Sequence, residues 1–312
     1  MLGLSAIFVA GMVAALASLV WFLQPPRGPA ASLPGNVPDG DSSAFLQASG
    51  GPTRYRSSLG SGRLIVLIPG ISYPMELYDE MFKALVAAGR SVLMYDVTGR
   101  GYSHSSGEKM TADLYVRQLA ELLDATGHGQ EEVDLVGWSM GSVIATHMAD
   151  RYPQRVARIV LLAPVGGIVP NKPWTANLIH LPLGIGPALA ALVVPSTLKK
   201  LYRAELGDGA LSQFLCDHVS RNPRLTRTMV STLTNLKEMD DNRRVLSSVG
   251  QHERPILILW GSGDATINRA NIDAIMQLLP RAKLEVFKGA GHAFLVKEVV
   301  HGTNEQVVRF LA

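Results

Sequence analysis

Three residues that could together form a nucleophile, a general base and an orienting acid each follow a separate strand-like segment of the chain. Ser139 is the centre of a Gly-Trp-Ser-Met-Gly sequence, after the short, strand-like run Val-Asp-Leu-Val at 133–136 and before the small, mostly apolar stretch 142–149. These runs predict a buried strand and a helix, with the serine at the sharp turn between them. Side chains at Gly137 and Gly141 would collide in such a turn, so both glycines are expected to support it. A hydroxyl held there can attack a carbonyl carbon.

A base and an acid that could activate this serine occur near the end of the chain. His292 follows the strand-like run 283–287, and Asp264 follows the apolar run 255–259. Both side chains are therefore expected at the carboxyl ends of strands, where open α/β sheets build their sites. Histidine can take the proton from a serine hydroxyl, and an aspartate can hold the imidazole in the right tautomer. The other seven histidines lack this setting and are expected on the surface or on helix faces.

The same chemistry needs donors for the negative charge that develops on the carbonyl oxygen. The apolar run 63–68 ends in Pro-Gly-Ile-Ser, where Gly70 lets the backbone approach a ligand. We therefore expect the backbone amides of Ile71 and Met140 to form an oxyanion hole. Two such amides would stabilise the transition state by a few kcal/mol.

Alternating strand and helix patterns predict a mostly parallel sheet flanked by helices. Strands are expected at 64–68, 91–96, 132–136, 157–162, 256–260 and 283–287, and helices at 77–88, 111–126, 140–151, 268–279 and 303–311. The alternation stops between 166 and 251, so this interval is interpreted as a helical cap inserted into a core formed by 63–165 and 252–312. Residues 180–195 within it are strongly apolar, and they could line an acyl pocket, dock on lipid or form the core of the cap.

Several motifs, in this order, resemble the α/β-hydrolases, in particular the bacterial esterase, monoacylglycerol-lipase-like and carbon-carbon hydrolase branch. The resemblance covers about residues 60–312 and rests on Leu-Ile-Pro-Gly at 67–70, Tyr-Asp-Val-Thr-Gly-Arg-Gly-Tyr-Ser at 95–103, the Ser139 turn, Leu-Leu-Ala-Pro at 161–164 and the turns at Asp264 and His292. Serine, then aspartate, then histidine is also the chain order of that family. Pro69 departs from it, because most relatives carry histidine there. Since the expected oxyanion donors are backbone amides, this change affects the support of the loop more than the chemistry.

The resemblance gives Asp96 and Arg100 a structural role. In relatives, hydrogen bonds to the aspartate hold the loop that contains them, and the loop's glycines permit the turn. His104, just beyond, is expected to be exposed. None of the three is counted among the catalytic residues.

The first 24 residues carry no charged side chain and are almost wholly apolar. As a helix they could cross a hydrocarbon core of about 30 Å, so a transmembrane anchor at 1–24 is predicted. A cleaved signal peptide is the alternative, because Ala-Leu-Ala at 15–17 resembles a cleavage site, although no basic segment precedes the apolar run. Residues 25–62, rich in Pro, Gly and Ser, are interpreted as a tether that leads into short strands near 43–57. Arg27 is the only nearby charge, and an extracytoplasmic catalytic domain is the preferred orientation.

Composition limits the partners and cofactors. The net charge of +3 is too modest to indicate a nucleic-acid partner. Cys216 is the single cysteine, which excludes an internal disulfide and a cysteine-based metal cluster. No H-E-x-x-H, P-loop or dinucleotide-binding pattern occurs, and we expect neither a metal nor an organic cofactor.

These features together predict a membrane-anchored serine hydrolase that cleaves carboxylic esters, such as acyl lipids of the monoacylglycerol type. The expected partners are the ester substrate and the membrane. Two alternatives stay open: a carbon-carbon bond hydrolase or haloperoxidase-like enzyme of the same fold, and a non-catalytic binding protein on this scaffold. The presence of Ser139, Asp264 and His292 together argues against the last, since nothing structural requires all three.

Overall fold

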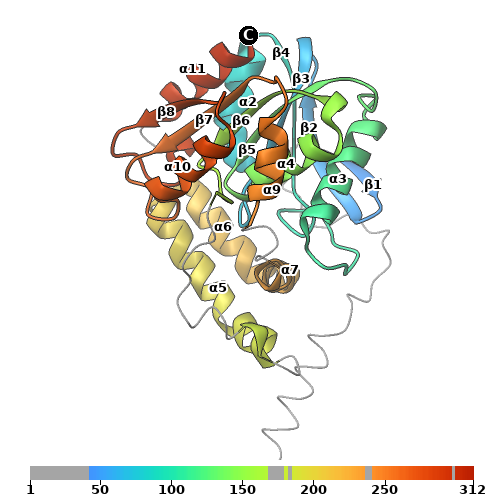
Figure 1. The fold of residues 1–312 in the computed structure, drawn as a ribbon. Coiled ribbons are helices and arrows are strands. Elements are labelled where there is room, and N and C mark those ends of the chain that lie inside the picture. Colours follow the sequence, from blue (N-terminus) through green and yellow to red (C-terminus); the bar gives the residue numbers. More distant parts are fainter. Residues whose placement is uncertain (1–41, 168–178, 182–184, 236–240, 297–298) are drawn as a thin grey trace, which may run out of the picture.

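An eight-stranded sheet runs through the computed structural model, in the order β1-β2-β4-β3-β5-β6-β7-β8 (Figure 1). The structure describes residues 42–167, 179–181, 185–235, 241–296 and 299–312. β2 pairs antiparallel with β1 and β4, and the pairs from β4-β3 to β7-β8 are parallel, which confirms the expected mostly parallel sheet. The strands are β1 (Ala44–Ala48), β2 (Gly51–Ser58), β3 (Ser61–Ile68), β4 (Arg90–Tyr95), β5 (Val133–Trp138), β6 (Val156–Leu162), β7 (Ile256–Gly261) and β8 (Lys283–Phe287).

Helices cover both faces of the sheet, because its central strands are apolar on both sides. In β3, Leu64, Val66 and Ile68 pack into the core on one face, while Ile65 and Leu67 pack into the core on the other. The first face is covered by α3 (Ala112–Ala125), α4 (Met140–Arg151), α9 (Arg243–Gly250) and α10 (Arg269–Leu278), and the second by α2 (Asp79–Ala87) and α11 (Val300–Leu311). The sheet is therefore a rigid support for the loops at its edge.

The observed elements differ from the expected ones mainly at their ends. The helix expected at 77–88 is a short 3-10 turn, η1 (Met75–Tyr78), followed by α2. Residues 43–57 contribute the antiparallel hairpin β1-β2, which extends the sheet beyond β4. α3 begins after Thr111, whose hydroxyl accepts a hydrogen bond from the Leu114 amide at 3.3 Å. Such a cap satisfies one of the free amides at a helix start and so fixes where the helix begins.

Three helices between β6 and β7 pack together at one end of the sheet (Figure 1). They are α5 (Ile185–Leu206), α6 (Ala210–Arg221) and α7 (Pro223–Thr234), and we refer to them as the cap helices. The Tyr202 hydroxyl of α5 donates to the Ser72 carbonyl at 2.6 Å, and the Thr228 hydroxyl of α7 donates to the Gly99 carbonyl at 2.8 Å. The cap helices thus contact the loops that follow β3 and β4. α9, from the same interval of the chain, packs instead against α4 and α10.

Asp96 holds the loop that follows β4, in the structural role expected for it. Its Oδ1 accepts a hydrogen bond from the Met75 amide at 2.8 Å, and its Oδ2 accepts from the Tyr102 amide at 2.8 Å. The buried Arg54 pairs with Asp96 at 3.2 Å and with Glu76 at 2.7 Å. Burial and the nearby Glu76 carboxylate raise the pKa of Asp96 to about 7, while Arg54 opposes the shift.

Within the part of the chain that the structure describes, no helix has both the length and the apolar character needed to span a membrane. The segment 1–24, predicted as an anchor, lies outside the described residues. Most of the expected tether, up to residue 41, lies outside them as well.

Candidate active site

Ser139 occupies a strained turn between β5 and α4. Its backbone has φ 52° and ψ −118°, a combination that non-glycine residues rarely adopt and that costs about 1–3 kcal/mol. The turn is tight on both sides: a Cβ on Gly137 would lie 2.3 Å from the Gly141 carbonyl oxygen, and one on Gly141 would lie 2.1 Å from the Ile68 carbonyl oxygen. The Ser139 amide donates to the Leu162 carbonyl of β6 at 2.8 Å. These close contacts hold the serine in its strained conformation, so that its side chain projects from the sheet edge.

His292 and Asp264 come together with Ser139, although they are far apart in the sequence. Nε2 of His292 lies 3.2 Å from Oγ of Ser139, and Nδ1 lies 2.8 Å from Oδ2 of Asp264. The other carboxylate oxygen, Oδ1, accepts the amides of Thr266 and Ile267, each at 2.8 Å. With the imidazole proton on Nδ1, Nε2 can accept the serine proton. The three side chains are therefore linked by a continuous chain of hydrogen bonds. They come from the segments that follow β5, β7 and β8.

The Ser139, His292 and Asp264 side chains are largely shielded from water. The Asp264 side chain is fully buried and that of His292 is 8% exposed. Ser139 is 7% exposed. Hydrogen bonds to a carboxylate are stronger in such surroundings than in water, so the imidazole is held in one orientation.

Trp138 supports the His292 loop, a role that was not predicted from the sequence. Its Nε1 donates to the His292 carbonyl at 3.1 Å, and the centres of the two rings are 5.0 Å apart. A Cβ placed on Gly70 would lie only 2.7 Å from the Trp138 ring. The indole thus separates and positions the His292 loop and the loop after β3. A large aromatic side chain directly before the serine was the available signal.

The expected oxyanion donors lie beside this set. Met140 is the first residue of α4, so its amide has no acceptor within the helix. Among the hydrogen bonds of the described residues, neither the Met140 amide nor the Ile71 amide has an acceptor. The ideal Cβ position on Gly70 is 3.4 Å from Cβ of Ser139, so the loop after β3 passes directly alongside the serine. Free amides in this position are suited to bind an oxygen that gains negative charge.

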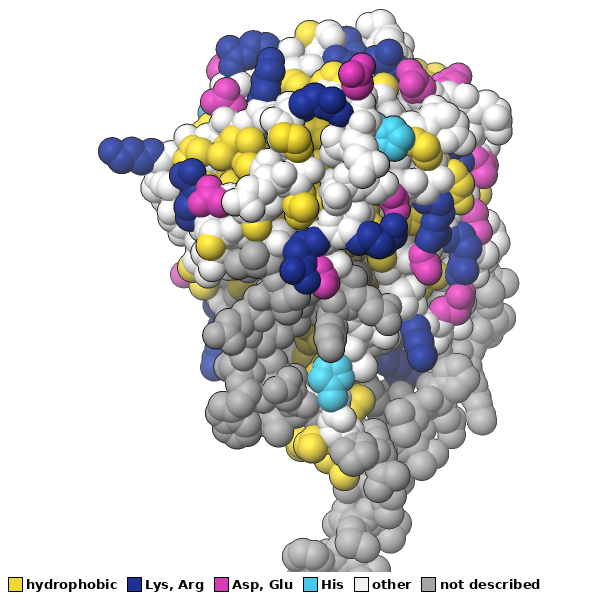
Figure 2. Space-filling model, viewed as in Figure 1, with side chains coloured by type: hydrophobic (Ala, Val, Ile, Leu, Met, Phe, Trp, Pro, Cys, Tyr) yellow, Lys and Arg dark blue, Asp and Glu magenta, His cyan; other side chains and the backbone are white. Residues whose placement is uncertain are grey.

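The apolar stretch 180–195 falls partly on α5. Four side chains spaced along one face of the helix are exposed: Ile185 by 45%, Leu189 by 47%, Leu192 by 77% and Val193 by 57%. Figure 2 shows apolar side chains at the lower end of the described surface, where α5 begins in Figure 1. These four residues are therefore not the core of the cap, which α5 instead reaches through residues such as Val194.

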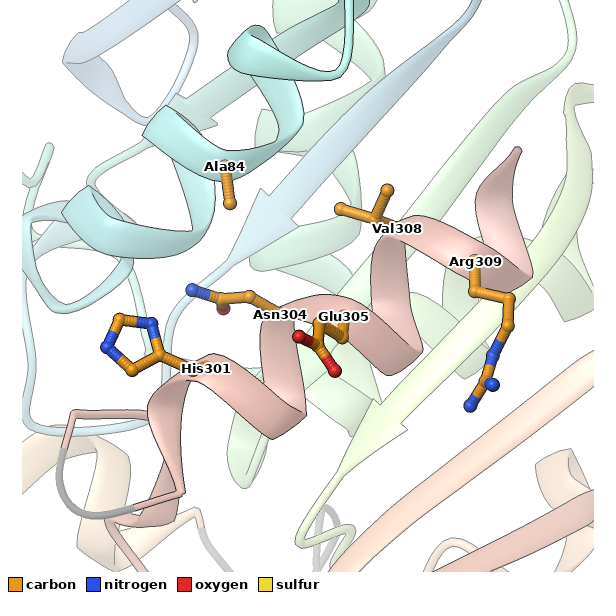
Figure 3. Close-up of a pocket in the computed structure, with 6 residues that line it drawn as sticks. All are labelled: Ala84, His301, Asn304, Glu305, Val308 and Arg309. Carbon is orange, nitrogen blue, oxygen red and sulfur yellow. The ribbon is translucent and has the colours of Figure 1, made fainter.

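A hollow on the surface lies between α2 and α11 (Figure 3). Ala84 lines it from α2, and His301, Asn304, Glu305, Val308 and Arg309 line it from α11. It contains none of the predicted site residues, so it is not part of the candidate active site. Across the described ranges of the chain, no three His, Cys, Asp or Glu side chains are grouped as metal ligands would be.

Comparison with known proteins bears on both fold and chemistry. The model of the alpha/beta hydrolase fold family matches residues 63–299. The 2-hydroxy-6-oxononadienedioate/2-hydroxy-6-oxononatrienedioate hydrolase of Burkholderia vietnamiensis is 30% identical over 241 residues, which span 73% of this chain and 78% of that protein. The "Probable lysophospholipase L2" of Haemophilus influenzae is 23% identical over 258 residues, which span 76% of this chain and 79% of that protein. Among solved structures, a hydrolase from Pseudomonas aeruginosa has a TM-score of 0.70 and 21% identity, and the match covers 88% of this chain and 100% of that one.

Proposed function

The chain belongs to the alpha/beta hydrolase fold family, and from that premise we propose that it is a serine hydrolase that cleaves carboxylic esters. The observation that carries the proposal is the unbroken path from Oγ of Ser139 through His292 to Asp264, with distances of 3.2 Å and 2.8 Å. The amides of Ile71 and Met140, which have no acceptor among the described residues, support it, since ester cleavage passes through an oxyanion. A fold without catalysis would not need both features at the same turn.

In the first half of the reaction, Ser139 becomes acylated. Its Oγ attacks the ester carbonyl carbon while Nε2 of His292 takes the hydroxyl proton. The carbonyl oxygen becomes an oxyanion that the amides of Ile71 and Met140 bind. When the tetrahedral intermediate collapses, the bond to the alcohol oxygen breaks and His292 transfers its proton to that oxygen. Asp264 stabilises the imidazolium between these two transfers.

In the second half, water replaces the alcohol. Nε2 of His292 takes a proton from water, whose oxygen attacks the acyl carbon of the acyl-enzyme. The second tetrahedral intermediate collapses by breaking its bond to Oγ of Ser139, which recovers the proton from His292. The products are a carboxylic acid and the free enzyme, so the cycle balances without another reactant.

We further propose that the substrate is an acyl lipid and that residues 1–24 anchor the enzyme in a membrane, with the catalytic domain on the extracytoplasmic side. The uncharged, apolar character of that segment supports the anchor. The exposed apolar face of α5 supports an enzyme that works next to lipid, because a soluble surface rarely gathers large apolar side chains along one helix. The Haemophilus influenzae relative is named as a probable lysophospholipase, and enzymes of that name act on a lipid ester.

Carbon-carbon bond hydrolysis is the second candidate. The Burkholderia relative favours it, because its sequence identity to this chain, 30%, is higher than the 23% of the Haemophilus relative. Both reactions can use the same serine, histidine and aspartate, so the substrate must decide between them. The experiment is turnover of nitrophenyl esters from acetyl to palmitoyl, beside a 2-hydroxy-6-oxo-dienoate ring-cleavage product. We expect turnover of the esters, with Ser139→Ala, His292→Ala and Asp264→Asn each slower by about 10⁴ or more. Turnover confined to the dienoate would replace the ester proposal with the second candidate.

A further inference from the structure

Arg100 is a buried cation whose hydrogen-bond partners among the described residues are all neutral. It is 1% exposed, in the loop after β4. Nε donates to the Ile71 carbonyl, and Nη1 donates to the Gly99 carbonyl at 3.1 Å and to the Thr228 hydroxyl at 3.0 Å. Nη2 donates to the Thr232 hydroxyl at 2.6 Å and lies 4.0 Å from Sδ of Met229. All five N–H groups of the guanidinium are thereby used.

The neutral surroundings of this guanidinium, within the described part of the chain, are unusual for a buried arginine. Among the described residues, no Asp or Glu forms an ion pair with Arg100. A buried charge without an opposite charge is costly, and proteins usually pair it. The four oxygen acceptors reduce that cost, but an apolar side chain of similar size would avoid it altogether. A role for the cation in the chemistry would explain why it is there.

A second buried donor holds the next carbonyl of the same loop. Tyr202 of α5 is fully buried, and its hydroxyl donates to the Ser72 carbonyl at 2.6 Å. Two consecutive carbonyls, those of Ile71 and Ser72, therefore accept hydrogen bonds from Arg100 and Tyr202. Arg100 is itself fixed on α7 through Thr228 and Thr232. The loop after β3 is in this way attached to two cap helices.

We propose that Arg100 and Tyr202 are positioning residues for the oxyanion hole, through which the cap helices set the orientation of the Ile71 amide. The inference rests on the proposed serine hydrolase function. The amide and the carbonyl of Ile71 flank the same α carbon, so holding the carbonyls of Ile71 and Ser72 restricts the backbone rotations that would turn the amide away from Ser139. The positive charge behind the loop also favours negative charge on the substrate oxygen.

A positioning role predicts a defect in the transition state and not in substrate binding. Tyr202→Phe removes one hydroxyl and keeps the ring that packs against Tyr73 at 5.2 Å. We expect kcat for nitrophenyl butyrate to fall about tenfold, less than the roughly 10²–10³-fold loss on removing an oxyanion donor itself. KM should stay within about twofold, since the amide binds the oxyanion more strongly than the ground-state carbonyl.

The decisive readout compares two inhibitors. A trifluoromethyl ketone adds to the serine and forms an oxyanion, whereas the matching methyl ketone binds largely as the intact carbonyl. We expect the affinity for the trifluoromethyl ketone to fall by the same factor as kcat, and the affinity for the methyl ketone to stay within about twofold. Loss of packing alone would weaken both inhibitors alike.

Tyr73→Phe is the matched control. It also deletes a buried tyrosine hydroxyl and breaks a contact with α5, because the Tyr73 hydroxyl donates to Glu205 at 2.6 Å. It leaves the carbonyls of Ile71 and Ser72 untouched. We expect kcat and the ratio of the two inhibition constants to stay within about twofold of the wild type.

Two further variants keep the inference testable if one protein folds poorly. Thr232→Val retains Arg100 and removes one of its anchors on α7, and Arg100→Lys retains the charge but loses the planar fork that spans α7 and the loop. Both should lower kcat and trifluoromethyl ketone affinity together, with the melting temperature measured beside them. The test uses those of Tyr202→Phe and Thr232→Val that fold. If their kcat and the ratio of their two inhibition constants are unchanged from the wild type, the inference is overturned and the proposed function stays intact. A wild type that turns over no ester would remove both.

Discussion

Gly70→Ala is expected to impair catalysis strongly while leaving the fold in place. Gly70 lies between the end of β3 and the expected oxyanion donor Ile71, and an added Cβ would be 2.7 Å from two carbons of the Trp138 ring. Packed carbon atoms prefer separations of about 3.5–4.0 Å. The loop or the indole must therefore move by roughly 1 Å. Either movement reaches the active site, because Trp138 also donates to the His292 carbonyl.

The size of the effect follows from this displacement. A misplacement of about 1 Å in a catalytic group can cost about 10²-fold in rate. Complete loss of one oxyanion donor costs about 10²–10³-fold. We therefore expect kcat/KM of Gly70→Ala to fall by about 10²-fold, mostly through kcat. Strain of 1–3 kcal/mol is the usual cost of an added carbon in a packed site, so the protein should still fold.

The assay is steady-state turnover of nitrophenyl butyrate, with the melting temperature measured on the same samples. Gly291→Ala is the matched control, because it adds a methyl group directly before His292 at a position with no heavy atom within 4 Å. Its rate should stay within about twofold of the wild type. A Gly70→Ala enzyme within about threefold of the wild type would refute the placement of the oxyanion hole beside Gly70.

Three further predictions concern strain, charge and the membrane. Ser139→Gly should have a higher free energy of unfolding than Ser139→Ala, by about 1 kcal/mol in chemical denaturation, because only alanine keeps the strain of φ 52°; equal values would contradict the strain. The Asp96 carboxyl has a pKa of about 7 when folded and 3.8 as its ordinary value, so the wild type should lose stability as the pH rises from about 4 to about 7. Asp96→Asn should make melting temperatures flatter over that range, and an unchanged slope would argue against a raised pKa. Deletion of residues 1–41 should yield a soluble enzyme with full rate on nitrophenyl butyrate and a lower rate on a monoacyl lipid in vesicles, since tethering raises the local substrate concentration. Equal rates on both substrates would contradict the lipid proposal.

The alternation of strands and helices along the chain could be predicted from the sequence, because strands buried on both faces are apolar runs between turns. Residues 256–260 are such a run, and β7 occupies it with one residue of difference. Residues 283–287 alternate charged and apolar side chains, as fits β8 at the edge of the sheet, and β8 has the expected bounds. The neighbourhood of Ser139, Asp264 and His292 was predictable for a related reason. Each follows a strand of a parallel sheet, and the carboxyl ends of these strands meet at one edge.

Contacts that depend on long-range packing could not be read in the same way. Residues 243–250 have the pattern of an amphipathic helix, but the pattern does not tell which neighbours its apolar side contacts. In the structure this helix, α9, packs against α4 and α10 and not against the cap helices. Similarly, nothing in the local sequence of Tyr202 pairs it with Ser72, which lies 130 positions earlier. Arg100 was expected to be structural from the family resemblance of its loop, whereas its attachment to α7 could not be predicted, because Thr228 and Thr232 lie about 130 positions later in the chain.

Covalent labelling with a fluorophosphonate, followed by mass spectrometry of the intact protein and its peptides, tests the central claim most directly. The reagent reacts with a serine that an adjacent base has activated and that an oxyanion hole serves. We predict one adduct per chain, located on the peptide that contains Ser139, and no adduct on Ser139→Ala. An adduct on another residue, equal labelling of Ser139→Ala, or no labelling of a folded wild type would contradict the account.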